Sequence, residues 1–279
     1  MKGLAELGRL VGAARVSARG EAVARASRDF AGHDLGRPLC VVRPASTEHV
    51  RRVVVWARKA GVGVTAAGGL TSFWAASRCP GRVVLDMRAM ARLLAVDPLE
   101  GVARAEAGMT VAALDAALAR KRLTLSGAPD GFGDATLGSL VANDTVAGLG
   151  QFHAPAASQV LGVTAVLGTG EVLRTGASAV LSGLPAFALR GAPDPTGLLC
   201  ASEGTLGVVT ELALAARPAV ERATFLVRSP STPKDFERLA RAARALRGTA
   251  GIERILVESW VSMRSDETRV DVAGPDAPA

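Results

Sequence analysis

The sequence of 279 residues has no tyrosine, only three cysteines and only three histidines. The cysteines and histidines are scattered, and they show none of the spacings that are typical of metal ligands: Cys40, Cys79, Cys200, His33, His49 and His153. The sequence therefore predicts no metal site. Three cysteines far apart also make a poor disulfide framework, and they indicate buried thiols in a reducing compartment.

The chain also lacks a long uncharged apolar run. None approaches the roughly 18 residues that a membrane-spanning helix requires. Lys2, Glu6 and Arg9 place charges near the N-terminus, where a signal peptide would carry an apolar block. The sequence therefore predicts neither a membrane span nor a secretion signal, and we expect a cytoplasmic location.

Lysine and aromatic residues are scarce, although the net charge is +7. Only four of the 33 basic residues are lysines, and aromatic residues make up 4% of the chain. The arginines are dispersed among acidic residues, whereas nucleic-acid binding typically uses a continuous basic stripe or aromatic stacking platforms. We therefore expect no nucleic-acid partner and attribute the arginine content to genome composition.

Hydrophobic residues are plentiful at 49%, and the length suits one large or two smaller globular domains. Residues 37–66 have the pattern of a strand, a helix and a second strand. Ser46 is the expected N-cap of the helix, and Gly61 is its expected C-terminal stop. This order of elements builds a mixed α/β layer.

Three glycine-rich turns stand between the predicted strands and helices. The first turn consists of Ala67, Gly68, Gly69, Leu70, Thr71 and Ser72. Successive backbone N–H groups in such a turn form a concavity for anions, and the threonine and serine hydroxyls add further donors. A diphosphate is the natural occupant of this turn.

The second turn spans residues 127–139 and opens a short helix near Thr136. We expect the N-terminus of this helix to present free N–H groups to a phosphate or to the polar edge of a ligand. The third turn places Gly204 and Gly207 before Val208 and Val209. These glycines let the backbone turn sharply beside a ligand, and the β-branched residues predict a buried strand.

Together, the three turns and the elements between them resemble the FAD-binding PCMH-type (vanillyl-alcohol oxidase-like) flavoproteins, nearest to the FAD-linked D-lactate and glycolate dehydrogenases. The resemblance implies an α+β fold, in which two subdomains hold FAD between them, with a short α/β C-terminal cap remnant. It implies that FAD contacts Ala67, Gly68, Gly69, Leu70, Thr71, Ser72, Pro129, Asp130, Ala135, Thr136, Leu137, Gly138, Ser139, Asn143, Glu203, Gly204, Gly207, Val208 and Val209.

The domain boundaries follow from the extent of the resemblance. We expect an N-terminal helical arm at residues 1–35, the FAD-binding PCMH-type domain at 36–218, and a truncated substrate or cap domain at 219–279. The last segment is predicted to contain strands near residues 223–227 and 255–259, a helix over 234–247, and a frayed end after residue 270.

The chain departs from the family pattern at a few positions. Leu70 and Ala201 stand where the family has glycines, and His153, Ala154 and Ser158 replace an aromatic–glycine pair and an aspartate. His153 is a candidate for a covalent flavin link or for a catalytic base, and a purely structural role is the alternative. No catalytic residue can be named from the sequence.

The resemblance implies an FAD-dependent oxidoreductase that oxidises a small 2-hydroxy acid by hydride transfer to the flavin. Because the cap is short, we expect a partner subunit or electron acceptor to act beside this chain. The alternative is a non-catalytic scaffold derived from such an enzyme, since a fold alone does not establish function.

Overall fold

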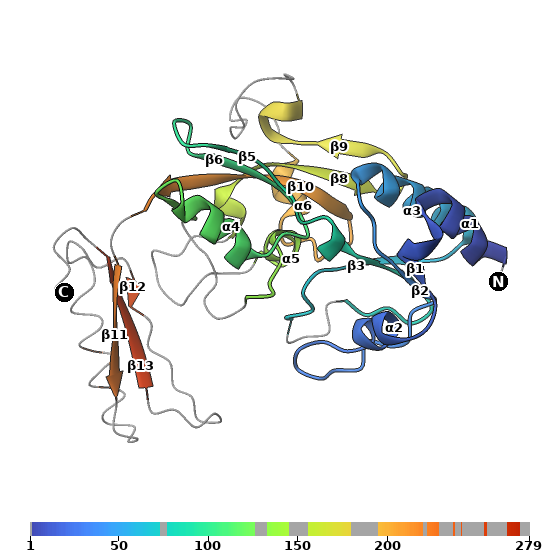
Figure 1. Ribbon diagram of the computed structural model, residues 1–279, viewed down its shortest axis with the longest axis horizontal. Coiled ribbons are helices and arrows are strands. Elements are labelled where there is room, and N and C mark those ends of the chain that lie inside the picture. Colours follow the sequence, from blue (N-terminus) through green and yellow to red (C-terminus); the bar gives the residue numbers. More distant parts are fainter. Residues whose placement is uncertain are drawn as a thin grey trace.

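The structure is a computed structural model, and it describes residues 2–72, 77–125, 133–144, 156–179, 195–219, 222–228, 237, 241, 254–255 and 267–273. Strands among these residues form three sheets, of four, six and three strands (Figure 1). Helices and strands occur in both of the larger sheet regions, so the chain has the α+β character that the sequence predicts.

The four-stranded sheet contains the predicted strand–helix–strand unit. Strands β2 (Cys40–Val42), β4 (Val83–Asp86) and β3 (Val64–Ala67) are parallel neighbours, and β1 (Val16–Ser17) pairs antiparallel with β2. Helix α3 (Thr47–Ala60) connects β2 to β3. The spatial order β1-β2-β4-β3 leaves β3 at an edge of the sheet.

Helix α3 begins and ends where its sequence signals stand. The Ser46 hydroxyl accepts a hydrogen bond from the His49 N–H at 3.2 Å, which satisfies one of the unpaired donors of the first turn. Gly61 ends the helix with φ of 66°, a left-handed conformation that glycine adopts without strain. Val50 and Val53 are fully buried on the inner face.

The N-terminal segment is only partly helical. Helix α1 (Lys2–Val11) and helix α2 (Glu21–Ala26) are separated by β1 and by a short 3₁₀ turn, η1 (Ala13–Arg15). Gly12 and Gly20 have positive φ at the two breaks. Helix α1 contacts α3, and Leu7 and Val11 of α1 belong to the same buried cluster as the α3 valines. This segment is therefore part of a core.

The six-stranded sheet is antiparallel and is built around its longest strand. Its strands are β5 (Leu93–Asp97), β6 (Val102–Glu106), β10 (Gly207–Pro218), β8 (Val160–Leu167) and β9 (Val172–Arg174) in spatial order, with β7 (Leu123–Leu125) paired to the end of β10. Two helices pack in its core, α4 (Val111–Ala119) and α5 (Leu137–Ala142). Shorter helical turns are η2 (Met87–Ala89), η3 (Ala156–Gln159), η4 (Gly176–Ala179) and α6 (Thr196–Leu199).

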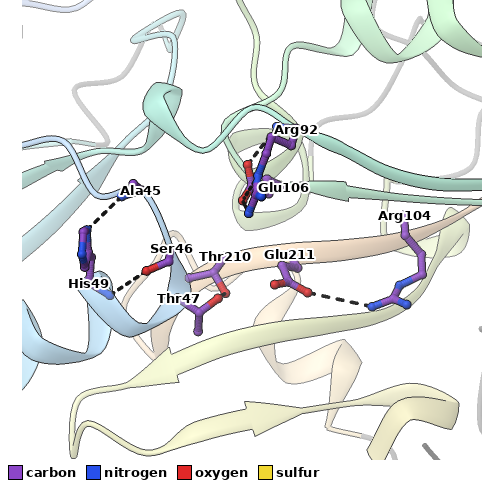
Figure 2. Close-up of polar contacts among 9 residues, drawn as sticks. All are labelled: Ala45, Ser46, Thr47, His49, Arg92, Arg104, Glu106, Thr210 and Glu211. Carbon is purple, nitrogen blue, oxygen red and sulfur yellow. Dashed lines mark hydrogen bonds and ion pairs between the residues drawn. The ribbon is translucent and has the colours of Figure 1, made fainter. Parts of the chain in front are cut away.

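The two larger sheets are joined through α3. Val166 of β8 and Val208 of β10 lie in the buried cluster of α3. The Thr47 hydroxyl at the start of α3 donates to the Thr210 hydroxyl at 2.9 Å (Figure 2). The Thr210 hydroxyl donates in turn to the carbonyl of Thr164 at 3.1 Å. Because Thr210 is fully buried, these bonds satisfy its hydroxyl and link the two sheets.

The third sheet lies in the C-terminal part of the chain. It contains β11 (Arg222–Arg228), β13 (Glu267–Ala273) and β12 (Arg254–Ile255) in that order, and all pairs are antiparallel. The expectation of a frayed end after residue 270 is wrong for residues 270–273, which pair with β11. The predicted helix over 234–247 lies outside the described residues, apart from residues 237 and 241.

Among the described residues, the helices are too short or too polar for any of them to span a bilayer.

The environment of His49 predicts a pH-dependent stability. Burial, followed by the charges of Arg15 and Arg52, lowers the pKa of His49, and its Nδ1 accepts a hydrogen bond from the Ala45 N–H at 3.3 Å (Figure 2). The folded state therefore resists protonation more than the unfolded state. We expect stability to be complete above pH 6.5, the ordinary pKa, and to fall as the pH drops below it.

The measurement is the melting temperature of the wild type and of His49→Asn between pH 7.5 and 5. Asparagine retains an acceptor but does not titrate, so its melting temperature should fall less over this range. Parallel curves for the two proteins would contradict the assignment.

Candidate functional site

A cavity of about 600 Å³ lies where the three glycine-rich segments meet. This volume is within the usual range of ligand pockets. Of the residues predicted to bind FAD, the cavity is lined by Ala67, Gly68, Leu70, Thr71, Ser72, Thr136, Gly138, Ser139, Asn143, Glu203, Gly204, Gly207 and Val209. The structure therefore brings segments more than 130 residues apart in the chain, such as Gly68 and Gly204, around one space.

Six of the predicted residues are not among the described lining. Gly69, Ala135, Leu137 and Val208 are buried and do not line the cavity, and Pro129 and Asp130 lie outside the described residues. His153 and Ala154, which the sequence singled out, also lie outside them. Ser158 belongs to η3 and does not line the cavity.

The first turn packs against the start of α5 at a distance that only glycine permits. A Cβ on Gly68 would overlap the Thr136 hydroxyl, and a Cβ on Gly69 would overlap the carbonyl oxygen of Asp134. Leu70 follows with φ of 60°, and its side chain packs against the buried cluster that contains Val23. Gly68 therefore leaves room for the Thr136 side chain, and Gly69 leaves room for the backbone at Asp134.

The donors of the first turn are available to a ligand. Among the described residues, the backbone N–H groups of residues 68–71 have no acceptor in the protein, whereas the carbonyl oxygens of Gly69 and Leu70 accept from Arg25 and from the Phe30 N–H. A left-handed residue within such a run forms the concave backbone surface that binds anions. The geometry thus fits the negatively charged diphosphate of FAD.

Helix α5 does not offer the free donors that the sequence led us to expect. The N–H of Leu137 donates to the Met109 carbonyl at 2.9 Å, and that of Gly138 donates to the Ala107 carbonyl at 2.7 Å. The N–H of Ser139 is bonded to the Thr136 hydroxyl. The prediction of free N–H groups at this helix end is therefore wrong, because strand and loop carbonyls use them first.

The third turn is fastened to the other end of α5. The N–H of Ala201 donates to the Val141 carbonyl at 3.0 Å, and that of Glu203 donates to the Ala142 carbonyl at 2.8 Å. Ala201 and Glu203 have φ of 55° and 49°, the left-handed region in which side chains are strained. Ala201 thus adopts a left-handed conformation, and its N–H bond to α5 holds it there.

Two arginines that were not among the predicted site residues also line the cavity. Arg78 and Arg82 line the cavity together with the residues of β3, and Ser77 and Pro80 also belong to the lining. The sequence shows that both arginines follow the first turn closely in the chain. Dispersed arginines are usually solvated, however, so this proximity alone did not predict a site. Only the folded arrangement shows that these two share a cavity with the glycine turns.

Several polar side chains near the cavity are paired or buried within the protein, so they are not available to react with a ligand. The Glu106 carboxylate, 2% exposed, accepts from the Arg92 backbone N–H and from its guanidinium at 2.8 Å each (Figure 2). Asp86 forms a similar pair with Arg88. Burial raises the pKa of the Cys40 thiol to about 11, and all three cysteines are buried as predicted, so Cys40 is a poor nucleophile.

Comparison with known proteins identifies the family. Residues 38–176 match the FAD-binding domain family. This chain belongs to that family, and its cofactor is FAD. An uncharacterised FAD-linked oxidoreductase of Mycobacterium tuberculosis is 32% identical over 188 residues, which cover 66% of this chain and 39% of that protein. The D-lactate dehydrogenase of Anaerostipes hadrus is 29% identical over 200 residues, covering 71% of this chain and 40% of the dehydrogenase.

The fold of this FAD-binding chain is that of the PCMH-type flavoproteins. The structure of p-cresol methylhydroxylase with substrate bound superposes with a TM-score of 0.75 at 20% identity, covering 91% of this chain and 50% of that one. The predicted fold class is therefore confirmed. The chain spans about two fifths of the length of the two curated relatives.

The close contact at Gly69 predicts the effect of adding one methyl group. Gly69→Ala would push the Asp134 carbonyl away and separate the first turn from α5, which should cost about 1–3 kcal/mol of stability. We expect at least a tenfold weaker affinity for FAD, measured by titration of the apoprotein. Gly168→Ala is the matched control, because among the described residues a Cβ there has nothing within 4 Å. Wild-type FAD affinity in Gly69→Ala would contradict this account.

The strained residue Ala201 predicts a stabilising substitution. A left-handed alanine costs about 1–2 kcal/mol, and the extra freedom of unfolded glycine offsets part of the gain. Ala201→Gly should therefore raise the free energy of unfolding by about 0.5–1 kcal/mol, measured by denaturant titration. Ala113→Gly, on the exposed face of α4, should lower it by a similar amount. Destabilisation by Ala201→Gly would show that the backbone strain is not relieved.

Proposed function

We propose that this protein uses FAD to oxidise a small 2-hydroxy acid by hydride transfer to the flavin. The observation that supports this most directly is the single cavity around which the three turns converge, with unpaired backbone donors on one side. The likeness to a D-lactate dehydrogenase favours a hydroxy-acid substrate, since lactate is a 2-hydroxy acid.

The residues of this chain have separable tasks in that reaction. Bound FAD supplies a two-electron acceptor. The first turn, residues 67–72, would hold the diphosphate through its N–H groups and through the hydroxyls of Thr71 and Ser72. The third turn, anchored to α5, would form the opposite wall through Gly204 and Gly207, and Asn143 at the C-terminal end of α5 would add an amide to it.

Oxidation of a hydroxy acid requires a base that accepts the proton of the substrate hydroxyl. Among the described lining residues we identify no such base. Among the described lining residues the titratable side chains are Arg78, Arg82 and Glu203, and Glu203 is exposed. We therefore propose that a partner subunit or a further part of the protein completes the substrate site. The same observation favours a second candidate, an FAD-binding subunit without catalysis of its own.

An absorption spectrum of the purified protein, before and after acid precipitation, tests the cofactor assignment. We expect a flavin band that is close to stoichiometric with protein. Release of the flavin into the supernatant shows non-covalent FAD, and retention in the pellet shows a covalent link, with His153→Ala as the next variant to examine. A protein that takes up no flavin, even after incubation with FAD, would contradict the proposal.

The substrate class is tested on the FAD-loaded protein without oxygen. D-Lactate and glycolate should bleach the flavin band, and the corresponding acids without the hydroxyl group, propionate and acetate, are the controls. If bleaching requires addition of a co-purifying subunit, the partner proposal is supported. If FAD binds but no 2-hydroxy acid reduces it under either condition, the non-catalytic candidate replaces the oxidoreductase.

A further inference from the structure

The cavity has an uneven distribution of charge. Among its described lining residues only Arg78, Arg82 and Glu203 carry charge, and both arginines lie in the turn that precedes β4. FAD carries two negative charges on its diphosphate, and backbone N–H groups offer only partial positive charges. Arg78 and Arg82 thus supply two full positive charges for a ligand with two negative ones, and Glu203 adds one negative charge to the lining.

The backbone of this turn is held firmly at the edge of the first sheet. The Thr65 hydroxyl of β3 donates to the Arg78 carbonyl at 3.1 Å. The Cys79 N–H donates to the Leu35 carbonyl at 2.8 Å. The buried Cys79 thiol donates to the Gly36 carbonyl at 3.1 Å. Both arginines therefore project from a turn that is anchored to β3 on one side and to the N-terminal segment on the other.

The position of the Arg82 side chain depends on a glycine. A Cβ on Gly63 would lie 3.2–3.3 Å from three atoms of the Arg82 side chain, including Nε and the guanidinium carbon. The guanidinium also donates to the Val64 carbonyl at 3.4 Å. Gly63 thus leaves the space in which Arg82 lies along the free edge of β3, beside the cavity.

Neither guanidinium is neutralised by a carboxylate within the described part of the chain. No ion pair joins Arg78 or Arg82 to an acidic residue there, unlike Arg88 and Arg92, which have Asp86 and Glu106. Guanidinium groups match phosphate oxygens in geometry as well as in charge. Two arginines without a carboxylate partner, on a cavity that also offers backbone N–H donors, are well suited to bind phosphate groups.

We propose that Arg78 and Arg82 are the residues that neutralise the diphosphate of FAD, while the first turn supplies the directional N–H donors. This inference rests on the proposed assignment of the cavity to FAD. The two arginines position the cofactor through its phosphates and act at no reacting atom.

The test is titration of the apoprotein with FAD and with riboflavin, which lacks phosphate, at low and at moderate salt. Arg78→Gln and Arg82→Gln should each weaken FAD affinity about tenfold, a change that corresponds to one hydrogen bond between charged groups. The dependence of FAD affinity on salt should become shallower, whereas riboflavin affinity should not change. Arg82→Lys should recover part of the lost affinity.

Arg120→Gln is the matched control. Arg120 is exposed at the end of α4 and, among the described residues, its side chain has no partner. The Arg120→Gln substitution should leave FAD affinity and the salt dependence of that affinity unchanged. Circular dichroism and the melting temperature of every variant establish that it is folded.

A double-mutant cycle with Gly63→Ala tests the placement of Arg82. The added methyl should weaken FAD binding in the wild-type background, because it displaces the guanidinium, and should have no further effect in Arg82→Gln. Equal effects in both backgrounds would overturn this part of the proposal.

The outcomes separate this inference from the proposed function. If the wild type binds no FAD, the assignment of the cavity fails. If the wild type binds FAD and both arginine variants bind it equally well with the same salt dependence, only the role of the arginines is overturned. If both variants lose FAD and riboflavin equally, the arginines support the ring-binding part of the cavity, and neutralisation of the diphosphate is rejected.

Discussion

The contact between the first glycine turn and the start of α5 is the constraint on which the site depends. At Gly68 and Gly69 the chain passes so close to Asp134 and Thr136 that no side chain fits between them. Gly138 makes a similar approach to Ala107, where a Cβ would lie 3.0 Å from the alanine side chain. Glycine is therefore needed here for close packing of the chain as much as for ligand access.

Helix α5 holds the site together instead of binding the ligand with its helix end. Its N-terminal donors are used by the Ala107 and Met109 carbonyls, and its last turn accepts the N–H groups of Ala201 and Glu203. A six-residue helix buried in this way ties the first and third turns to the six-stranded sheet. Among the described residues, the backbone N–H groups of residues 68–71 are donors without an acceptor in the protein, so the first turn and the neighbouring arginines contribute to the electrostatics of the site.

The replacements of family glycines are accommodated by the backbone. Leu70 and Ala201 both occupy left-handed conformations, and neighbouring hydrogen bonds hold them there: Phe30 donates to the Leu70 carbonyl, and Ala201 donates to Val141. The strain is modest on the scale of a folded domain. Leu70 and Ala201 thus adopt the left-handed conformations of these turns although neither residue is glycine.

Local chemistry in the sequence determined the strand–helix–strand unit, the ends of α3, the glycine turns and the family, because caps, periodicity and glycine conformations act over a few residues. The division into domains, the cofactor contacts and any role of His153 remain predictions. Tertiary structure alone decided that α1 enters the core, that the donors of α5 are already paired, and that Arg78 and Arg82 face the cavity. These features depend on which distant carbonyls, carboxylates and strands arrive beside each group, and no short stretch of sequence encodes that choice.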